Sequence, residues 1–162
     1  MKKAVLFLFF FWAIITNGIA QKITDFEATT ITGEQIKLSE LKGKIVVLNF
    51  WFKACKPCII EIPYLQKLTE KYKDKNVVFL ALCTDDEETL KSFLANEKFD
   101  YKHIANARSI AQKWGVQGYP TNIVIDEKGN IVLNEKGLMI VNNAPETPQL
   151  IDKKIQELLQ NK

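Results

Sequence analysis

Residues 49–63 read NFWFKACKPCIIEIP, and this stretch holds two cysteines separated by two residues. It overlaps the apolar, β-branched run Ile45–Trp51, which predicts a strand buried on both faces of an α/β sheet. Apolar residues then recur at helical spacing, which predicts a helix with one buried stripe and a kink at Pro63. The stripe consists of Ile59, Ile62, Leu65, Leu68 and Tyr72. The pair Cys55 and Cys58 therefore lies between a buried strand and the start of a helix.

A helix N-terminus favours thiolate chemistry, because it presents unpaired N–H groups and the positive end of the helix dipole. We expect Cys55, at the mouth of the helix, to be the exposed attacking sulfur. Cys58 lies one turn further in, close enough to attack a mixed disulfide formed by Cys55. Pro57 suits the first helical turn, and Lys56 adds a positive charge that also favours a thiolate.

The same cysteine spacing also occurs in zinc sites, and two buried structural cysteines would fit it as well. A structural zinc site normally needs four protein ligands. Beyond the pair, the chain offers only Cys83 and His103, with no paired spacing. We therefore expect no metal site and no separate cofactor, and the surroundings of the pair decide its role. Cys83 is expected to be a small buried residue, His103 an exposed residue of an edge strand, and Trp114 part of the core.

The remaining pattern predicts an α/β fold with a mixed central sheet and helices on both faces. A second buried strand is expected at Val77–Cys83, and a helix capped by residues 84–87 should bury Leu90, Phe93 and Leu94. Shorter elements are expected around them: a hairpin at Phe26–Leu38, a helical turn at Ser39–Gly43, an edge strand at Tyr101–Ile104, a helix at Ser109–Trp114, a hairpin of Thr121–Asp126 with Ile131–Lys136, a loop at 142–148 and a last helix from about Pro148 to Gln160.

Composition indicates a soluble globular protein: 47% of the 162 residues are hydrophobic and 25% are charged. These values exclude a disordered chain, a collagen-like chain and a polytopic membrane protein. The formal net charge is +3, and without residues 1–20 it falls to +1, from 20 basic and 19 acidic residues. Such a balance gives no electrostatic basis for binding nucleic acid.

The first twenty residues have the layout of a secretory signal peptide. Lys2 and Lys3 precede an apolar run, Ala4–Ile15, and Gly18-Ile19-Ala20 places small residues before a cut ahead of Gln21. We expect a signal peptide at 1–20, cleavage after Ala20, and one domain at 21–162 with no stable membrane insertion. The alternative is an uncleaved N-terminal anchor. Either way, residues 21–162 are expected in the periplasm or otherwise outside the cytoplasm, where disulfides persist.

Residues 49–63 resemble the active-site stretch of thioredoxin-like proteins. More narrowly, they resemble exported TlpA/ResA-like thiol–disulfide oxidoreductases, whose pattern is N-F-W-x-x-W-C-x-x-C-x-x-E-x-P. Far along the chain, residues 116–121, VQGYPT, resemble the G-x-P-T segment of that family. The resemblance covers roughly residues 23–160. It implies a thioredoxin-like three-layer α/β/α fold with a mixed central sheet and an N-terminal β-hairpin extension.

The resemblance implies a role for each matching residue. Cys55 would be the nucleophile and Cys58 the resolving thiol, so that the two form a redox-active disulfide. Pro120 would follow a cis peptide bond beside the cysteines, block metal capture, and leave the backbone of Tyr119 free to pair with a substrate strand. Glu61 would be a catalytic proton acceptor, although a solvated first-turn carboxylate is the alternative.

Four positions around the site call for comment. Classical thioredoxins carry a buried aspartate where this chain has Asn49, which does not titrate, so Glu61 is the remaining candidate base. Ala54 replaces the usual tryptophan, and Phe52 and Lys53 replace smaller or polar residues. The rim of the site is therefore changed, which bears on the substrate and not on the dithiol chemistry.

The family resemblance implies a reductase of protein disulfides, with a membrane thiol-reducing protein of the DsbD/CcdA type as electron donor. An apocytochrome c CxxCH site is one implied substrate, which would place the protein in cytochrome c-type biogenesis. A disulfide-donating oxidase with the same residues is the first alternative. A peroxiredoxin would need a P-x-x-x-T-x-x-C stretch, and here residues 49–54, directly before Cys55, contain no threonine. Copper-handling modules of this fold usually place three residues between the cysteines, whereas this chain has two.

Overall fold

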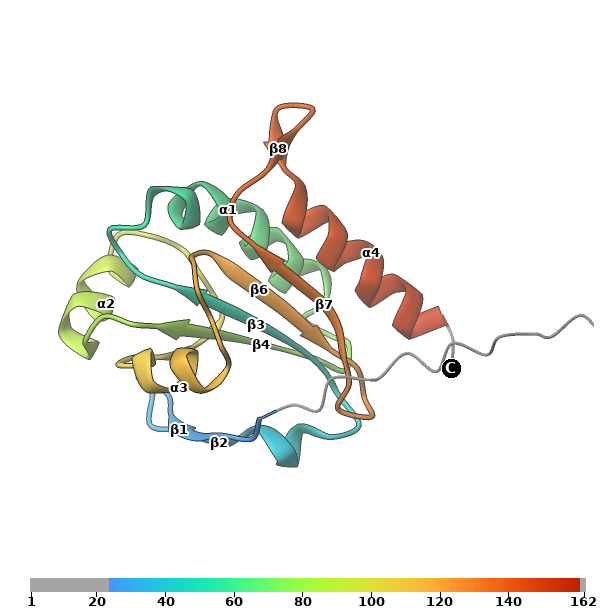
Figure 1. The fold of residues 1–162 in the computed structure, drawn as a ribbon, viewed down its shortest axis with the longest axis horizontal. Helices are drawn as coiled ribbons and strands as arrows, with labels where there is room; N and C mark the ends of the chain where they lie inside the picture. The colour runs from blue at the N-terminus through green and yellow to red at the C-terminus, as the bar shows by residue number, and fades with distance from the viewer. Residues whose placement is uncertain (1–23, 161–162) are drawn as a thin grey trace, which may run out of the picture.

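The computed structural model describes residues 24–160 (Figure 1). At its centre is a five-stranded sheet in the order β5-β4-β3-β6-β7. Strand β3 is parallel to β4, which is parallel to β5, whereas β6 is antiparallel to both β3 and β7. The strands are β3 (Ile45–Trp51), β4 (Val77–Cys83), β5 (Lys102–Ile104), β6 (Thr121–Ile125) and β7 (Ile131–Lys136). The mixed sheet expected from the sequence is confirmed.

All residues of the central strand β3 are buried, because both faces of the sheet are covered. Ile45, Val47 and Trp51 pack under α1 (Lys56–Lys71), α2 (Glu87–Leu94) and α4 (Glu146–Gln160). Val46 and Leu48 face α3 (Arg108–Lys113), η1 (Leu38–Leu41) and the hairpin of β1 (Glu27–Thr29) and β2 (Gln35–Lys37). Figure 1 shows α1 and α4 above the sheet and α3 with the β1–β2 hairpin below it. The three layers and the N-terminal hairpin extension are therefore as expected.

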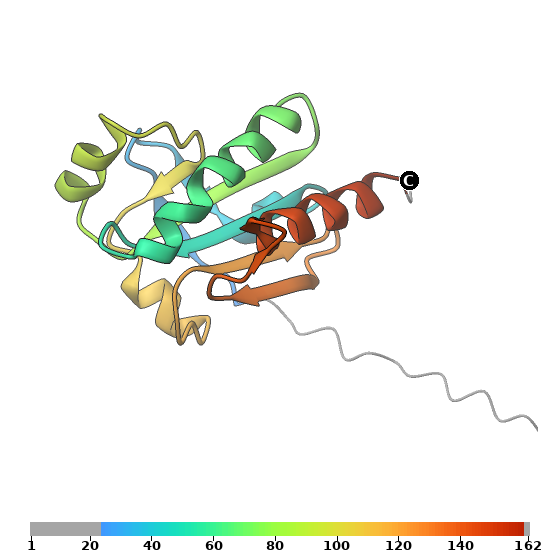
Figure 2. The ribbon, with the colours of Figure 1, turned by 90° about the horizontal axis from the view of Figure 1, so that it is seen from above.

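Helix α1 runs without interruption from Lys56 to Lys71 through Pro63. Its buried stripe is the expected one: Ile62, Leu65 and Leu68 are buried, and α4 lies beside it over the strands (Figure 2). The next helix, α2, begins where the sequence predicted. Its N-cap is Asp86, whose carboxylate accepts a hydrogen bond from the N–H of Thr89 at 2.7 Å.

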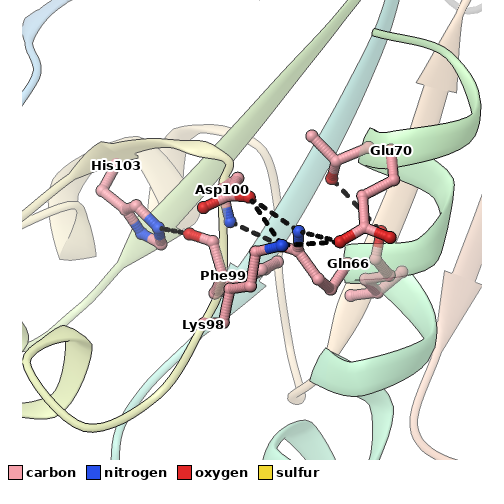
Figure 3. Close-up of polar contacts among 8 residues, drawn as sticks. Gln66, Glu70, Lys98, Phe99, Asp100 and His103 are labelled. Carbon is pink, nitrogen blue, oxygen red and sulfur yellow. Dashed lines mark hydrogen bonds and ion pairs between the residues drawn. The ribbon is translucent and has the colours of Figure 1, made fainter.

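A polar network ties the middle of α1 to the segment between α2 and β5 (Figure 3). The amide of Gln66 donates to Asp100 Oδ2 at 2.7 Å and to Glu70 Oε1 at 3.1 Å, and it accepts from the N–H of Asp100 at 2.7 Å. Lys98 also contacts Glu70, at 2.7 Å. Gln66 is only 7% exposed, and this buried amide is satisfied by Asp100 of that segment and by Glu70 of its own helix.

The expectation that His103 is exposed is wrong. It lies on the edge strand β5, yet only 5% of it is exposed. Its ring packs against Trp51 and Phe99, and Nε2 lies 2.6 Å from the carbonyl oxygen of Phe99. The segment between α2 and β5 covers this side of the edge strand, which is why an edge position is buried. Burial lowers the pKa of His103.

Residues 137–148 hold more structure than the expected loop. Strands β8 (Ile140–Val141) and β9 (Ala144–Pro145) form a small antiparallel hairpin, which projects from the body in Figure 1, and α4 begins at Glu146 rather than Pro148. The two turn residues, Asn142 and Asn143, have φ angles of 50° and 62°. Asparagine tolerates this left-handed conformation, and two such residues in succession make a hairpin turn.

The expected signal peptide and its cleavage site fall outside the described residues. Among residues 24–160, no helix is long and apolar enough to cross a membrane.

Candidate active site

The two cysteines lie where β3 ends and α1 begins. Cys55 is the N-cap of α1, and its Sγ accepts a hydrogen bond from the N–H of Cys58 at 3.2 Å. The N–H of Cys55 donates to the carbonyl oxygen of Phe52 at 3.1 Å, which fixes the turn between strand and helix. The two sulfurs are joined in a disulfide, with the Cα atoms 5.3 Å apart. A backbone donor aimed at Sγ and the N-terminus of a 16-residue helix both stabilise a thiolate at Cys55.

In this disulfide form Cys55 is less exposed than expected. It is 5% exposed and Cys58 is 2% exposed, and both belong to the apolar cluster under α1. The attacking sulfur was predicted to be open to solvent, and that prediction is wrong for the disulfide form. The reason is that Phe52 and Tyr119 pack against the same cluster, with their rings edge to face and the centroids 5.3 Å apart.

The segment before β6 lies next to the disulfide because β6 is antiparallel to β3, with Thr121 opposite Phe50. The Tyr119–Pro120 peptide bond is cis. Thr121 Oγ1 donates to the carbonyl oxygen of Gly118 at 2.7 Å. The N–H of Gly137 donates to the carbonyl oxygen of Pro120 at 2.8 Å. Within residues 24–160, the main-chain N–H and C=O of Tyr119 have no hydrogen-bond partner.

Glu61 is wholly buried, at 0% exposure, so the alternative of a solvated carboxylate is wrong. Its Oε2 accepts a hydrogen bond from Asn122 Nδ2 at 2.9 Å. Burial raises the pKa of Glu61 from its usual 4.5 to about 7, and the side chains of Asn122 and Thr147 act against that rise. A carboxyl with a pKa near neutrality, one helical turn beyond Cys58, can take up or release a proton at physiological pH.

Asn49 extends this polar group into the sheet. Its Nδ2 donates to Asn122 Oδ1 at 2.9 Å, and the two residues lie directly opposite each other in β3 and β6. Sequence reasoning named Asn49 and Glu61 and missed Asn122. A signal was present, since Asn122 is the one amide in the run TNIVI, where an apolar residue would suit a central strand.

Cys83 is buried at 0% exposure, as expected. Its thiol lies 3.6 Å from Asp85 Oδ2, and burial raises its pKa to about 12. Cys83 is therefore a protonated, unreactive thiol at neutral pH. Among residues 24–160, no group of three or more His, Cys, Asp or Glu side chains is placed to hold a metal ion.

Comparison with known proteins agrees with this geometry. The profile of the AhpC/TSA family matches residues 19–134. The chain belongs to the AhpC/TSA family. It is 38% identical over 115 residues to the thiol-disulfide oxidoreductase ResA of Bacillus cereus, and 35% identical over 112 residues to the thioredoxin-like protein YneN of Bacillus subtilis. These matches cover 68% and 67% of this chain, and 65% and 66% of the two relatives, which is somewhat less than two thirds of their length.

Solved structures of thiol-disulfide proteins have the same fold as this chain. A crystal structure from Chlorobium tepidum, described as a thiol:disulfide interchange protein DsbE, superposes with a TM-score of 0.75 at 28% identity. That match covers 85% of this chain and 95% of the other. A solution structure from Bacteroides thetaiotaomicron, described as a protein disulfide isomerase, gives a TM-score of 0.74 at 26% identity and covers 88% and 90%. The thioredoxin-like fold and the resemblance based on residues 49–63 are thus confirmed.

Proposed function

We propose that this AhpC/TSA family member is a thiol–disulfide oxidoreductase that works through Cys55 and Cys58. The observation that carries the proposal is the Cys55–Cys58 disulfide at the N-terminus of α1. Two further features support it: the free main chain of Tyr119 beside the pair, and the buried acid Glu61 behind it. The relatives ResA and DsbE carry names of the same activity.

In the proposed reaction the reduced pair delivers two electrons to a substrate disulfide. The Cys55 thiolate attacks one sulfur of that disulfide, and the other sulfur leaves as a thiolate and is protonated from solvent. Cys58 then loses its proton to Glu61 and attacks Cys55 Sγ. The bond between Cys55 and the substrate breaks, the second substrate sulfur leaves as a thiolate, and the Cys55–Cys58 disulfide forms.

The substrate class we propose is a protein disulfide presented on an extended segment. The unpaired N–H and C=O of Tyr119 offer main-chain hydrogen bonds to such a segment, and Pro120 has no N–H of its own to compete. Phe52 and Tyr119 supply an apolar rim, and Lys53 and Lys56 are exposed next to Cys55. A surface of this kind suits a polypeptide better than a small polar molecule.

The direction and place of action also belong to the proposal. We propose an exported reductase comprising residues 21–162 after removal of a signal peptide, fed by a membrane thiol-reducing protein of the DsbD/CcdA type. A reductase outside the cytoplasm needs such a source, since that compartment is kept oxidising. Cytochrome c maturation is the process we propose it serves, with apocytochrome c disulfides as substrates.

The experiment that tests the function uses three serine variants in a disulfide-reduction assay with a protein substrate. Cys55→Ser is expected to abolish reduction, because the nucleophile is lost. Cys58→Ser is expected to accumulate a mixed disulfide between Cys55 and the substrate, visible by mass under non-reducing conditions. Cys83→Ser is the matched control, and its activity should equal that of the wild type because the Cys83 thiol is buried and protonated.

Full activity of Cys55→Ser would refute the mechanism. Peroxide consumption by the wild type without any partner dithiol would instead favour a peroxiredoxin. The segment before Cys55, residues 49–54, contains no hydroxyl side chain of the kind that such peroxidases use.

A further inference from the structure

Asn49 and Asn122 form a buried pair of amides, and Asn122 in turn donates a hydrogen bond to Glu61, the base in the proposed reaction. Asn49 is 1% exposed and Asn122 is 0% exposed. Burying an amide costs free energy unless it is hydrogen-bonded, and β-branched or apolar residues would suit these strand positions better. The two amides therefore call for a reason beyond the packing of the sheet.

The direction of the hydrogen bonds follows from their chemistry. An ionised carboxylate can only accept, so the group of Asn122 that faces Glu61 must be its NH₂. Its oxygen then faces Asn49, whose own NH₂ donates to it at 2.9 Å. With Asn122 Nδ2 already donating to Glu61 Oε2 at 2.9 Å, a proton taken up by Glu61 goes to Oε1.

We propose that Asn122 is a positioning residue for proton transfer: oriented by Asn49, its amide holds Glu61 Oε2 and stabilises the ionised carboxylate that receives the Cys58 proton on Oε1. Asn49 and Asn122 lie opposite each other on the antiparallel strands β3 and β6, so the pairing of these strands fixes the position of the donor. This inference rests on the proposed function and adds to it a residue that orients the base.

The other groups around Glu61 do not supply this function. Tyr101 faces Glu61 from the segment before β5, and burial together with the charge of Glu61 raises the pKa of its hydroxyl well above the usual value. The side chain of Thr147 in α4 also lowers the pKa of Glu61, but its effect is smaller than that of Asn122. Cys83 of β4, in the same apolar cluster, stays protonated. On α1 itself the titratable neighbour is Cys58, one turn earlier.

The test follows single turnovers of the reduced full-length protein with an aromatic disulfide whose released thiolate absorbs visible light. Attack by Cys55 releases the first equivalent, and attack by Cys58 on the mixed disulfide releases the second. The rate of the second phase is measured from about pH 5 to about pH 9. In the wild type it should rise with pH, with a midpoint near the Glu61 pKa of about 7.

Asn122→Val removes the donor and keeps a strand-forming side chain. The midpoint of the second phase should move up by on the order of one pH unit, so that this phase slows about fivefold at about pH 7 and recovers at higher pH. The first phase should not change. Gln66→Leu is the matched control: it removes another buried amide, one that belongs to α1 itself and has no hydrogen bond to Glu61, and it should leave the midpoint in place (Figure 3).

A double variant separates positioning from general damage. Glu61→Gln should abolish the pH midpoint, and adding Asn122→Val to it should cause no further slowing, because the amide acts only through Glu61. Equal slowing at all pH values with an unchanged midpoint in Asn122→Val would overturn the proposal. So would additional slowing in the Glu61→Gln background.

If Asn122→Val does not fold, Asn122→Asp answers the same question. Its side chain has nearly the same shape and still accepts from Asn49, but it places a second carboxyl against Glu61. The midpoint should then rise by more than about one pH unit, since two adjacent carboxylates resist ionising together. An unchanged midpoint would overturn the inference. A wild type that releases no second equivalent would refute the proposed function itself, which is a different result.

Discussion

At the residue scale, the site depends on one side chain, Glu61, whose burial costs folding free energy when it is ionised. Glu61 is a wholly buried acid on the active-site helix, and its main compensation is a single amide donor. Its folded-state pKa of about 7 lies above the 4.5 expected when the chain is unfolded. The ionised form is thus less stable in the folded protein than in the unfolded chain, a cost that is accepted at sites that need a base near neutrality.

The pH dependence of stability follows with a definite sign. The contribution of Glu61 is fully present below about pH 4.5 and is lost as the pH rises through about 7. Glu61→Gln should therefore make the oxidised protein more stable than the wild type at about pH 8, by up to about 3 kcal/mol, and this gain should shrink towards about pH 5. Denaturant unfolding of both proteins at the two pH values measures the difference.

The difference in unfolding free energy between Glu61→Gln and the wild type does not contain the contributions of the other titrating groups, because both proteins share them. His103 acts in the opposite direction, since burial lowers its pKa and its contribution is lost as the pH falls. A stability difference between Glu61→Gln and the wild type that does not change with pH would contradict the buried, proton-binding carboxyl.

At the element scale, the sequence predicts the long elements well and the short hairpin poorly. Strand β3 is a continuous apolar run, as expected for a strand buried on both faces, and helix α1 has one apolar stripe. Both elements lie where the sequence predicted them. Strands β8 and β9 have two residues each, too few for any periodicity. The turn chemistry of Asn142-Asn143 was the available signal.

The hairpin turn gives a prediction that needs no active-site assay. Asn143 has a φ of 62°, a conformation that glycine adopts freely and β-branched residues resist. Asn143→Gly should leave the free energy of unfolding unchanged, whereas Asn143→Val should lower it by about 1 kcal/mol. Denaturant titration of the oxidised protein compares the two. Equal stabilities would show that the left-handed turn does not contribute to folding.

At the scale of the whole molecule, the site is assembled from segments far apart in the chain. The cysteines and Glu61 come from the β3–α1 junction, Tyr119 and Pro120 from the loop before β6, and Asn122 from β6 itself. A family resemblance could name the first two segments from the sequence. The contact between Asn122 and Glu61 could not be predicted in this way, because it depends on the register of β6 against β3 and on which face each side chain takes. The burial of His103 was missed because it depends on the segment between α2 and β5, which covers that edge strand.

The most direct test of the account is the equilibrium reduction potential of the Cys55–Cys58 pair, titrated against a dithiol buffer of known potential. An exported reductase must hold electrons that it readily gives up. We therefore predict one two-electron transition near the thioredoxin level, roughly −270 mV, which is lost in both Cys55→Ser and Cys58→Ser. A value near the DsbA level, about −120 mV, would contradict the reductase and identify a disulfide donor, and the lack of any reversible couple would contradict the dithiol chemistry itself.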